Sequence, residues 1–89
     1  MLNYKLYIGS NNETKELEIS KIQDVLNREF EGYTIQIVTG YWKGSKEDTA
    51  LISITSNSES KIEEIVNTLK VELKQEAIGL QTEPAIKFI

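Results

Sequence analysis

The sequence of 89 residues contains neither histidine nor cysteine. Without histidine, the chain lacks the commonest general base and the commonest transition-metal ligand. Without cysteine, it has no disulfide framework, no thiolate nucleophile and no cysteine-ligated metal centre. These absences exclude catalysis by Ser-His or Cys-His pairs, and we expect no metal ion and no other cofactor.

Long apolar runs are also missing. No run approaches the ~20 residues that a membrane-spanning helix needs. The first residues, 1–5, lack the apolar core of a signal peptide. We therefore expect a cytoplasmic protein with no membrane partner.

Basic residues are fewer than acidic ones. Ten Lys and Arg stand against 14 Asp and Glu, which gives a formal net charge of -4. Binding a polyanion needs clustered Lys and Arg. The composition therefore argues against a nucleic-acid partner.

What the sequence does contain is a central stretch, residues 33–55, that is typical of a β-hairpin. Two runs rich in β-branched and aromatic residues, 33–42 and 49–55, flank a polar connection at 44–48. Alternation places Ile35 and Ile37 on one face of the first strand. It places Val38 and Trp42 on the other face, unless Gly40 marks a bulge that reverses the phase.

Strand and helix patterns surround this hairpin. Residues 3–9 alternate as a first strand. Two apolar stripes at helical spacing coincide with predicted capping boxes, Ser20 with Gln23 and Ser60 with Glu63. Gly32 is expected to end the first helix, and the second should end near 72–75, with Gly79 as its terminator. Residues 77–89 contain the single proline, Pro84, and predict one kinked edge strand or two short ones.

The order β-α-β-β-α-β predicts an α+β fold of the ferredoxin-like type in a single domain spanning residues 1–89. One antiparallel sheet would carry both helices on one face. The strand positions expected in the core are Leu6, Ile8, Ile35, Ile37, Ile52 and Ile54.

Several short motifs resemble an uncharacterised bacterial family, domain of unknown function 3574. They are Leu-Tyr-Ile-Gly at 6–9, the helix end at 27–32, Gly-Tyr-Trp-Lys-Gly at 40–44, the Lys-Glu pair at 46–47 and Lys-Gln-Glu-Ala at 74–77, followed by a strand with proline in its middle. The resemblance covers most of the chain. It implies the same fold and no known activity.

The most suggestive functional feature is the sheet face turned away from the helices. Exposed aromatic side chains favour recognition, because they bury much area at a low entropy cost. We predict a non-catalytic binding domain, a homodimer that packs through this open face. The expected contact residues are Tyr7, Val38, Tyr41, Trp42, Lys43 and Leu51.

Two other functions remain open. One is a phage or mobile-element inhibitor that docks acidic faces on a basic host protein. Its best-fitting residues are Glu13, Glu16, Glu18, Glu63, Glu64 and Glu72. The other is a small enzyme or ligand-binding protein with a pocket between subunits, using Tyr7, Tyr41, Lys5 and Glu47.

Two further chemistries are disfavoured. The fold hosts RNA-recognition modules, which stack bases on aromatic residues of the first and third strands. Tyr7 fits the first strand, but residues 51–55 contain no aromatic side chain. Glu47 and Asp48 lack the spaced carboxylates of a calcium loop.

Overall fold

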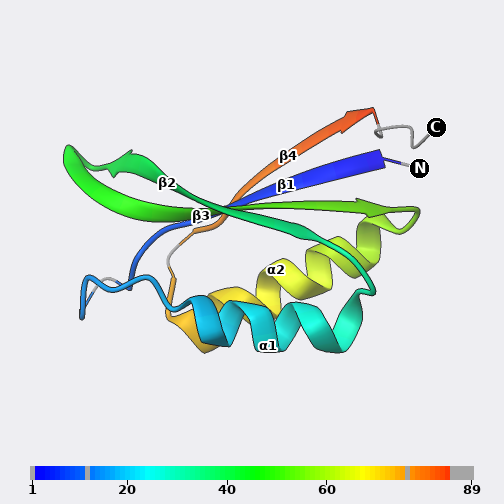
Figure 1. The fold of residues 1–89 in the computed structure, drawn as a ribbon, viewed down its shortest axis with the longest axis horizontal. Helices are drawn as coiled ribbons and strands as arrows, with labels where there is room; N and C mark the ends of the chain where they lie inside the picture. Colours follow the sequence, from blue (N-terminus) through cyan, green and yellow to red (C-terminus); the bar gives the residue numbers. More distant parts are fainter. Residues whose placement is uncertain (1, 12, 76, 85–89) are drawn as a thin grey trace.

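A computed structural model describes residues 2–11, 13–75 and 77–84. The elements are β1 (Leu2–Ile8), α1 (Ile19–Glu29), β2 (Thr34–Trp42), β3 (Ser45–Ser56), α2 (Glu59–Leu73) and β4 (Gly79–Pro84). The strands form one antiparallel sheet in the order β2-β3-β1-β4. Both helices cover the same face of that sheet (Figure 1). The predicted α+β, ferredoxin-like architecture is confirmed.

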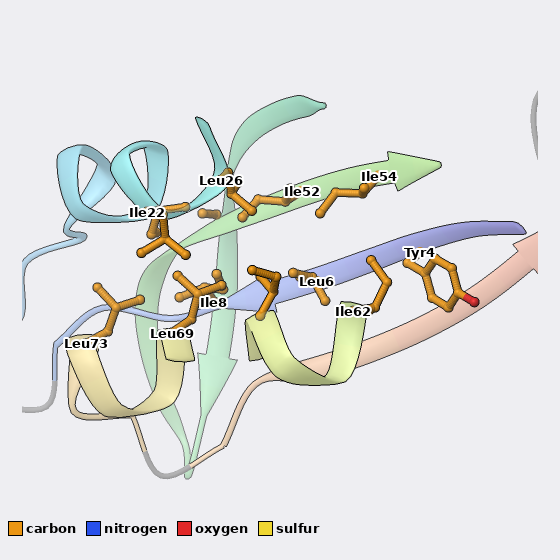
Figure 2. Packing of buried hydrophobic residues seen from close by; sticks show 13 residues of the cluster. Tyr4, Leu6, Ile8, Ile22, Leu26, Ile52, Ile54, Ile62, Leu69 and Leu73 are labelled. Carbon is orange, nitrogen blue, oxygen red and sulfur yellow. The ribbon is translucent and has the colours of Figure 1, made fainter. Parts of the chain in front are cut away.

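The core lies between the helices and the two central strands. Leu6 and Ile8 of β1 and Ile52 and Ile54 of β3 are buried there, as predicted (Figure 2). Alternation along each strand directs these side chains to one face, and the helical stripes cover them. The helix residues buried against them are Ile22, Val25, Leu26, Ile62, Ile65, Leu69 and Leu73.

Of the two isoleucines of β2, Ile35 packs against the core and Ile37 departs from the prediction. Ile35, opposite Ile52, is only half-buried, and Ile37 is 60% exposed. β2 is the outer strand of the sheet, and its hairpin with β3 runs beyond the ends of the helices (Figure 1). Ile37 faces the correct side of the sheet, but the helices do not cover it.

The hairpin is longer and tighter than predicted. β3 already begins at Ser45, so the expected polar connection at 44–48 is mostly strand. The loop is Lys43 and Gly44, with φ values of 50° and 81°. Positive φ at both central residues matches a type I′ turn, whose twist suits a two-residue hairpin. The register is regular from Thr34 to Trp42, so Gly40 causes no bulge.

Both predicted capping boxes are wrong. α2 begins after Ser58, whose Oγ accepts a hydrogen bond from the Lys61 backbone N–H at 3.2 Å. α1 begins after Glu18, which makes no side-chain cap, so Ser20 lies inside the helix. Serine occurs at 56, 58 and 60, so the sequence offers three similar N-cap residues. Which serine caps α2 depends on where β3 ends and the chain turns into the helix.

α1 does not end where predicted, whereas α2 ends within the predicted range 72–75. α1 ends at Glu29, and the extended Phe30 follows it, so Gly32 is not its terminator. α2 ends at Leu73 with Lys74 in the left-handed region, which leaves Gly79 free to begin β4. β4 pairs with β1 up to Pro84. The remainder of the predicted strand segment 77–89, residues 85–89, lies outside the described residues.

Candidate binding site at the hairpin end of the sheet

One half of the open sheet face, over β1 and β4, is polar and internally paired. The Asn3 amide donates to Glu83 at 3.0 Å, and Lys5 Nζ lies 3.1 Å from the same carboxylate oxygen. The Tyr7 hydroxyl donates to Gln81 at 2.9 Å. The hydrogen bond from Lys5, followed by that from Asn3, lowers the pKa of Glu83 below its ordinary value. This half of the face offers few unsatisfied groups to a partner.

The other half contains a hollow of about 330 Å³. It lies where the β2–β3 hairpin passes the end of β1 and the segment that enters β4. The residues lining it are Tyr7, Gly9, Gly40, Tyr41, Trp42, Glu47, Thr49, Gln75, Ala77, Ile78 and Gly79.

Three glycines around the hollow allow neighbouring side chains to approach the backbone closely. A Cβ on Gly79 would lie 3.2 Å from Tyr7 Cβ, and a Cβ on Gly9 would lie 2.5 Å from Glu47 Oε1. A Cβ on Gly40 would overlap Thr49 Oγ1. Glycine inside a strand often marks such a close approach. The shape of the hollow therefore depends on these three positions.

Glu47 is the one acidic or basic side chain among the described residues that line the hollow. Its Oε2 accepts a hydrogen bond from the Ser10 backbone N–H at 3.3 Å. Its Oε1 has no hydrogen-bond partner within the described parts of the chain. This carboxylate can therefore accept a donor from a ligand.

Gln75 fixes the opposite wall. Its side-chain amide donates to the carbonyl oxygens of Gly9, at 3.2 Å, and Ser10, at 3.0 Å. These two bonds join the segment after α2 to the end of β1. The wall is thus held by a side chain that the sequence patterns did not single out.

The two aromatic residues predicted on the open face have different surroundings. Tyr7 is 38% exposed, its ring lies against Gly79, and its hydroxyl is bonded to Gln81. An aromatic ring over a glycine of an edge strand stabilises that pair. Trp42 is 47% exposed near the hairpin turn, with Lys43 Nζ 5.9 Å from its ring centroid. Trp42 is therefore the more available recognition surface.

The remaining predicted contact residues are divided between surfaces. Val38 and Leu51 lie half-buried on the open face, outside the lining of the hollow. Tyr41 borders the hollow and is 73% exposed, although alternation turns it to the face opposite Trp42. Lys43 lines a second hollow of about 720 Å³, which also has Trp42 and Glu47 in its wall.

Sequence reasoning missed the glycines, Thr49 and Gln75 as parts of the site. Gly40 carried a usable signal, since it interrupts a strand pattern without a bulge. Gly9 and Gly79 sit at strand ends, where glycine usually marks a turn. Their role emerges only from the pairing of β1 with its neighbours.

Neither a cluster of metal-binding side chains nor a membrane-spanning helix occurs among the described residues. Within 2–11, 13–75 and 77–84, no three or more acidic side chains gather as a metal site would require. No helix in those ranges is long and apolar enough to cross a membrane.

No family model and no curated protein matches the chain. Its resemblance to domain of unknown function 3574 therefore stays a prediction. Similar folds occur among solved structures. A DUF3240 family protein from Shewanella baltica has a TM-score of 0.69 and 12% identity, over 98% of this chain and 92% of that one.

Two further structures share the architecture. A phage SAM lyase in its apo state has a TM-score of 0.65 at 14% identity, covering 99% of this chain and 92% of its own. The periplasmic divalent cation tolerance protein CutA from Archaeoglobus fulgidus has a TM-score of 0.57 at 17% identity, covering 100% and 88%. At such identities the likeness shows the ferredoxin-like fold alone.

Proposed function

We propose that this chain is a non-catalytic binding domain whose recognition site is the hollow at the hairpin end. The observation that carries the proposal is the hollow itself, about 330 Å³ in volume, with an available carboxylate and an exposed indole in its wall. That volume is near the lower end of ordinary ligand pockets. It suits one amino-acid side chain or a compact small molecule better than a large cofactor.

The chemistry of the wall favours a basic group with an apolar stem. Glu47 supplies the negative charge and an oxygen, Oε1, that accepts no hydrogen bond from the described residues. The faces of Tyr7 and Trp42 attract cations and also pack against aliphatic carbon. An arginine or lysine side chain of a partner protein combines both requirements.

Catalysis is less well supported by the same geometry. Among the described lining residues, Glu47 is the sole carboxylate, and the Tyr7 hydroxyl is already committed to Gln81. General acid–base chemistry usually needs a second group positioned on the reacting atoms. One similar structure is named a SAM lyase, so an enzymatic use of the fold, with a pocket completed by a second subunit, is the competing outcome.

Ion pairs within the chain weaken the case for an inhibitor that docks through acidic faces. Glu18 lies 3.2 Å from Lys21, and Glu72 lies 3.5 Å from Arg28. Glu63 and Glu64, in the second turn of α2, are exposed. The inhibitor alternative therefore rests on fewer charges than the sequence offered.

Self-association through the open face is the second candidate. It is favoured by the exposed Tyr7 and Trp42, with the half-buried Val38 and Leu51 between them. Sedimentation of the wild type and of Trp42→Ala and Tyr41→Ala variants tests this candidate. Loss of the dimer in the Trp42 variant alone supports it, because Tyr41 projects from the opposite face of β2. A monomer at high concentration contradicts it.

The ligand preference is tested with small probes. Trp42 is the sole tryptophan of the chain, so its fluorescence reports on the hollow. We expect N-acetyl-arginine amide to cause a saturable change and N-acetyl-norleucine amide, which lacks the charge, to bind at least tenfold more weakly. Glu47→Gln should remove this difference. Asp48→Asn, which removes the same charge from the opposite face of β3, should preserve it.

Equal binding of the charged and neutral probes would show that Glu47 does not select the ligand. No response to any probe, with the variants folded, would contradict the hollow as a site for basic groups. A metabolite carried through purification and released on denaturation would favour the enzymatic alternative.

A further inference from the structure

The outer edge of β2 has no partner in the described structure. β2 pairs with β3 over all nine of its residues, and it is one of the two terminal strands of the sheet. No backbone hydrogen bond from its other side to a turn or loop is found among the described residues. Half of its backbone donors and acceptors therefore face outward along an extended, regular strand.

This edge carries none of the features that usually prevent strand addition. Residues 34–42 contain no charged side chain and no proline, and the register shows no bulge. Natural proteins blunt exposed edges with lysine, proline, bulges or short strands. The other edge strand, β4, has six residues and includes Glu83 and Pro84. Only β4 shows this protection.

Exposed apolar side chains accompany the free edge. Ile37 is 60% exposed and Tyr41 is 73% exposed, both on the side of the hairpin beyond the helices. A strand added to β2 would place new side chains beside them, as cross-strand pairs do within a sheet. The free backbone and the uncovered side chains thus occur on the same element.

A second copy of the chain can pair with the free backbone groups of β2 through its own β2, in a symmetric arrangement. Antiparallel pairing of two β2 strands around a two-fold axis overlaps all nine residues when Val38 lies opposite its own copy. In that register Ile35 lies opposite Tyr41, and Gln36 lies opposite Gly40. Like charges opposite one another destabilise a strand pair, and this pairing contains no charge. Two copies that each carry a net charge of -4 can therefore meet here with little local repulsion.

We propose that β2 pairs with β2 of a second copy to form one continuous eight-stranded sheet. This interface goes beyond the proposed binding function, because it uses the edge of the sheet and leaves the hollow open. The two hollows would lie on the same face of the joined sheet. A partner with two basic groups could then bind both.

Opposite charges introduced at Thr39 test the interface directly. Thr39 is exposed and projects from the face opposite the hollow, and it would lie diagonally across from its own copy. We expect wild type to sediment as a dimer, and Thr39→Lys and Thr39→Glu each to raise the dissociation constant at least tenfold. An equal mixture of the two variants should recover the dimer as a heterodimer. Val71→Lys and Val71→Glu, on the exposed side of α2, should leave it unchanged.

A single cysteine tests the register. Because the chain has no cysteine, Val38→Cys supplies its sole thiol. Directly opposite residues of an antiparallel pair have Cα atoms roughly 4.5–5.5 Å apart, which a disulfide can span. Mild oxidation should link two copies through residue 38, while Val71→Cys should stay largely unlinked.

Three results would overturn the proposal. The first is a wild type that is monomeric at about 100 µM, and the second is a dimer whose dissociation constant is unchanged in Thr39→Lys and Thr39→Glu. The third is a mixture of these two variants that stays monomeric while each variant keeps the native circular dichroism spectrum. A dimer broken by Trp42→Ala and unaffected at residue 39 would assign the contact to the open face instead. A failure at this edge leaves the ligand titration of the hollow untouched, so the two proposals fail separately.

Discussion

Ile37 and Ile52 face the same side of the sheet on adjacent strands, and they should differ sharply when truncated to alanine. Ile52 is fully buried beneath the helices, whereas Ile37 is 60% exposed at the hairpin. Removing a buried isoleucine side chain costs about 2–5 kcal/mol, because a cavity remains. Ile37→Ala loses less than half of the burial and leaves no closed cavity, so we expect about 1 kcal/mol or less.

The consequence for unfolding is large at this chain length. A domain of 89 residues has roughly 4–13 kcal/mol of total stability at 0.05–0.15 kcal/mol per residue. Ile52→Ala should therefore remove a substantial fraction of it and lower Tm by about 10–25 °C. Ile37→Ala should lower Tm by only a few degrees.

Urea unfolding followed by Trp42 fluorescence and far-ultraviolet circular dichroism measures both effects. The protein concentration is held where each variant is monomeric, so that loss of association does not enter the comparison. Equal costs for the two variants, or a larger cost at Ile37, would refute the claim that the hairpin extends beyond the core.

Three further outcomes follow from named contacts. Ser58→Ala should destabilise the protein by about 1 kcal/mol in urea unfolding, since it removes a helix cap, while Ser60→Ala should change it little. Glu83 has a lowered pKa in the folded protein, so its stabilising contribution is present above its ordinary value near 4.5 and lost as the pH falls further. Acid unfolding of Glu83→Gln should therefore show a shallower dependence on pH below that value. Gly40→Ala should destabilise the sheet by about 1–3 kcal/mol through overlap with Thr49. Thr49→Ala should relieve that cost in a double-mutant cycle.

The fold was predictable because the spacing of hydrophobic residues indicates which segments are strands and helices and which of their faces are buried. Strand alternation around Leu6 and Ile52 and the stripe through Ile62 and Leu69 identified the core layers, and the element order then favoured one topology. These signals depend on side chains that must be buried, so they survive errors of a few residues at the element ends.

Element boundaries were less predictable because several residues offer the same local chemistry. Ser58 and Ser60 are both good N-caps, and tertiary placement of the chain after β3 chooses between them. The polar residues 45–48 resemble a loop, yet they continue β3 because the hairpin projects beyond the core. Ile37 was misassigned for the same reason, since alternation gives the face of a residue but not what covers that face.

The hollow was the least predictable feature. Its walls come from the end of β1, the turn end of the β2–β3 hairpin and the segment before β4, which are distant in sequence. Glu47 and Trp42 were noticed separately, but nothing local indicated that Gly9 and Gly79 would make room beside them. Such a site depends on strand pairing across the sheet, which a single sequence does not specify.

The proposed recognition of a basic group by the hollow is tested most directly by one pair of titrations. N-acetyl-arginine amide is titrated into the wild type and into Glu47→Gln, with Trp42 fluorescence as the signal. A lost charge-assisted hydrogen bond is worth about 1.5–3 kcal/mol, so binding to the variant should weaken at least tenfold. Identical affinities for the two proteins would contradict the central role given to Glu47 and to the hollow around it.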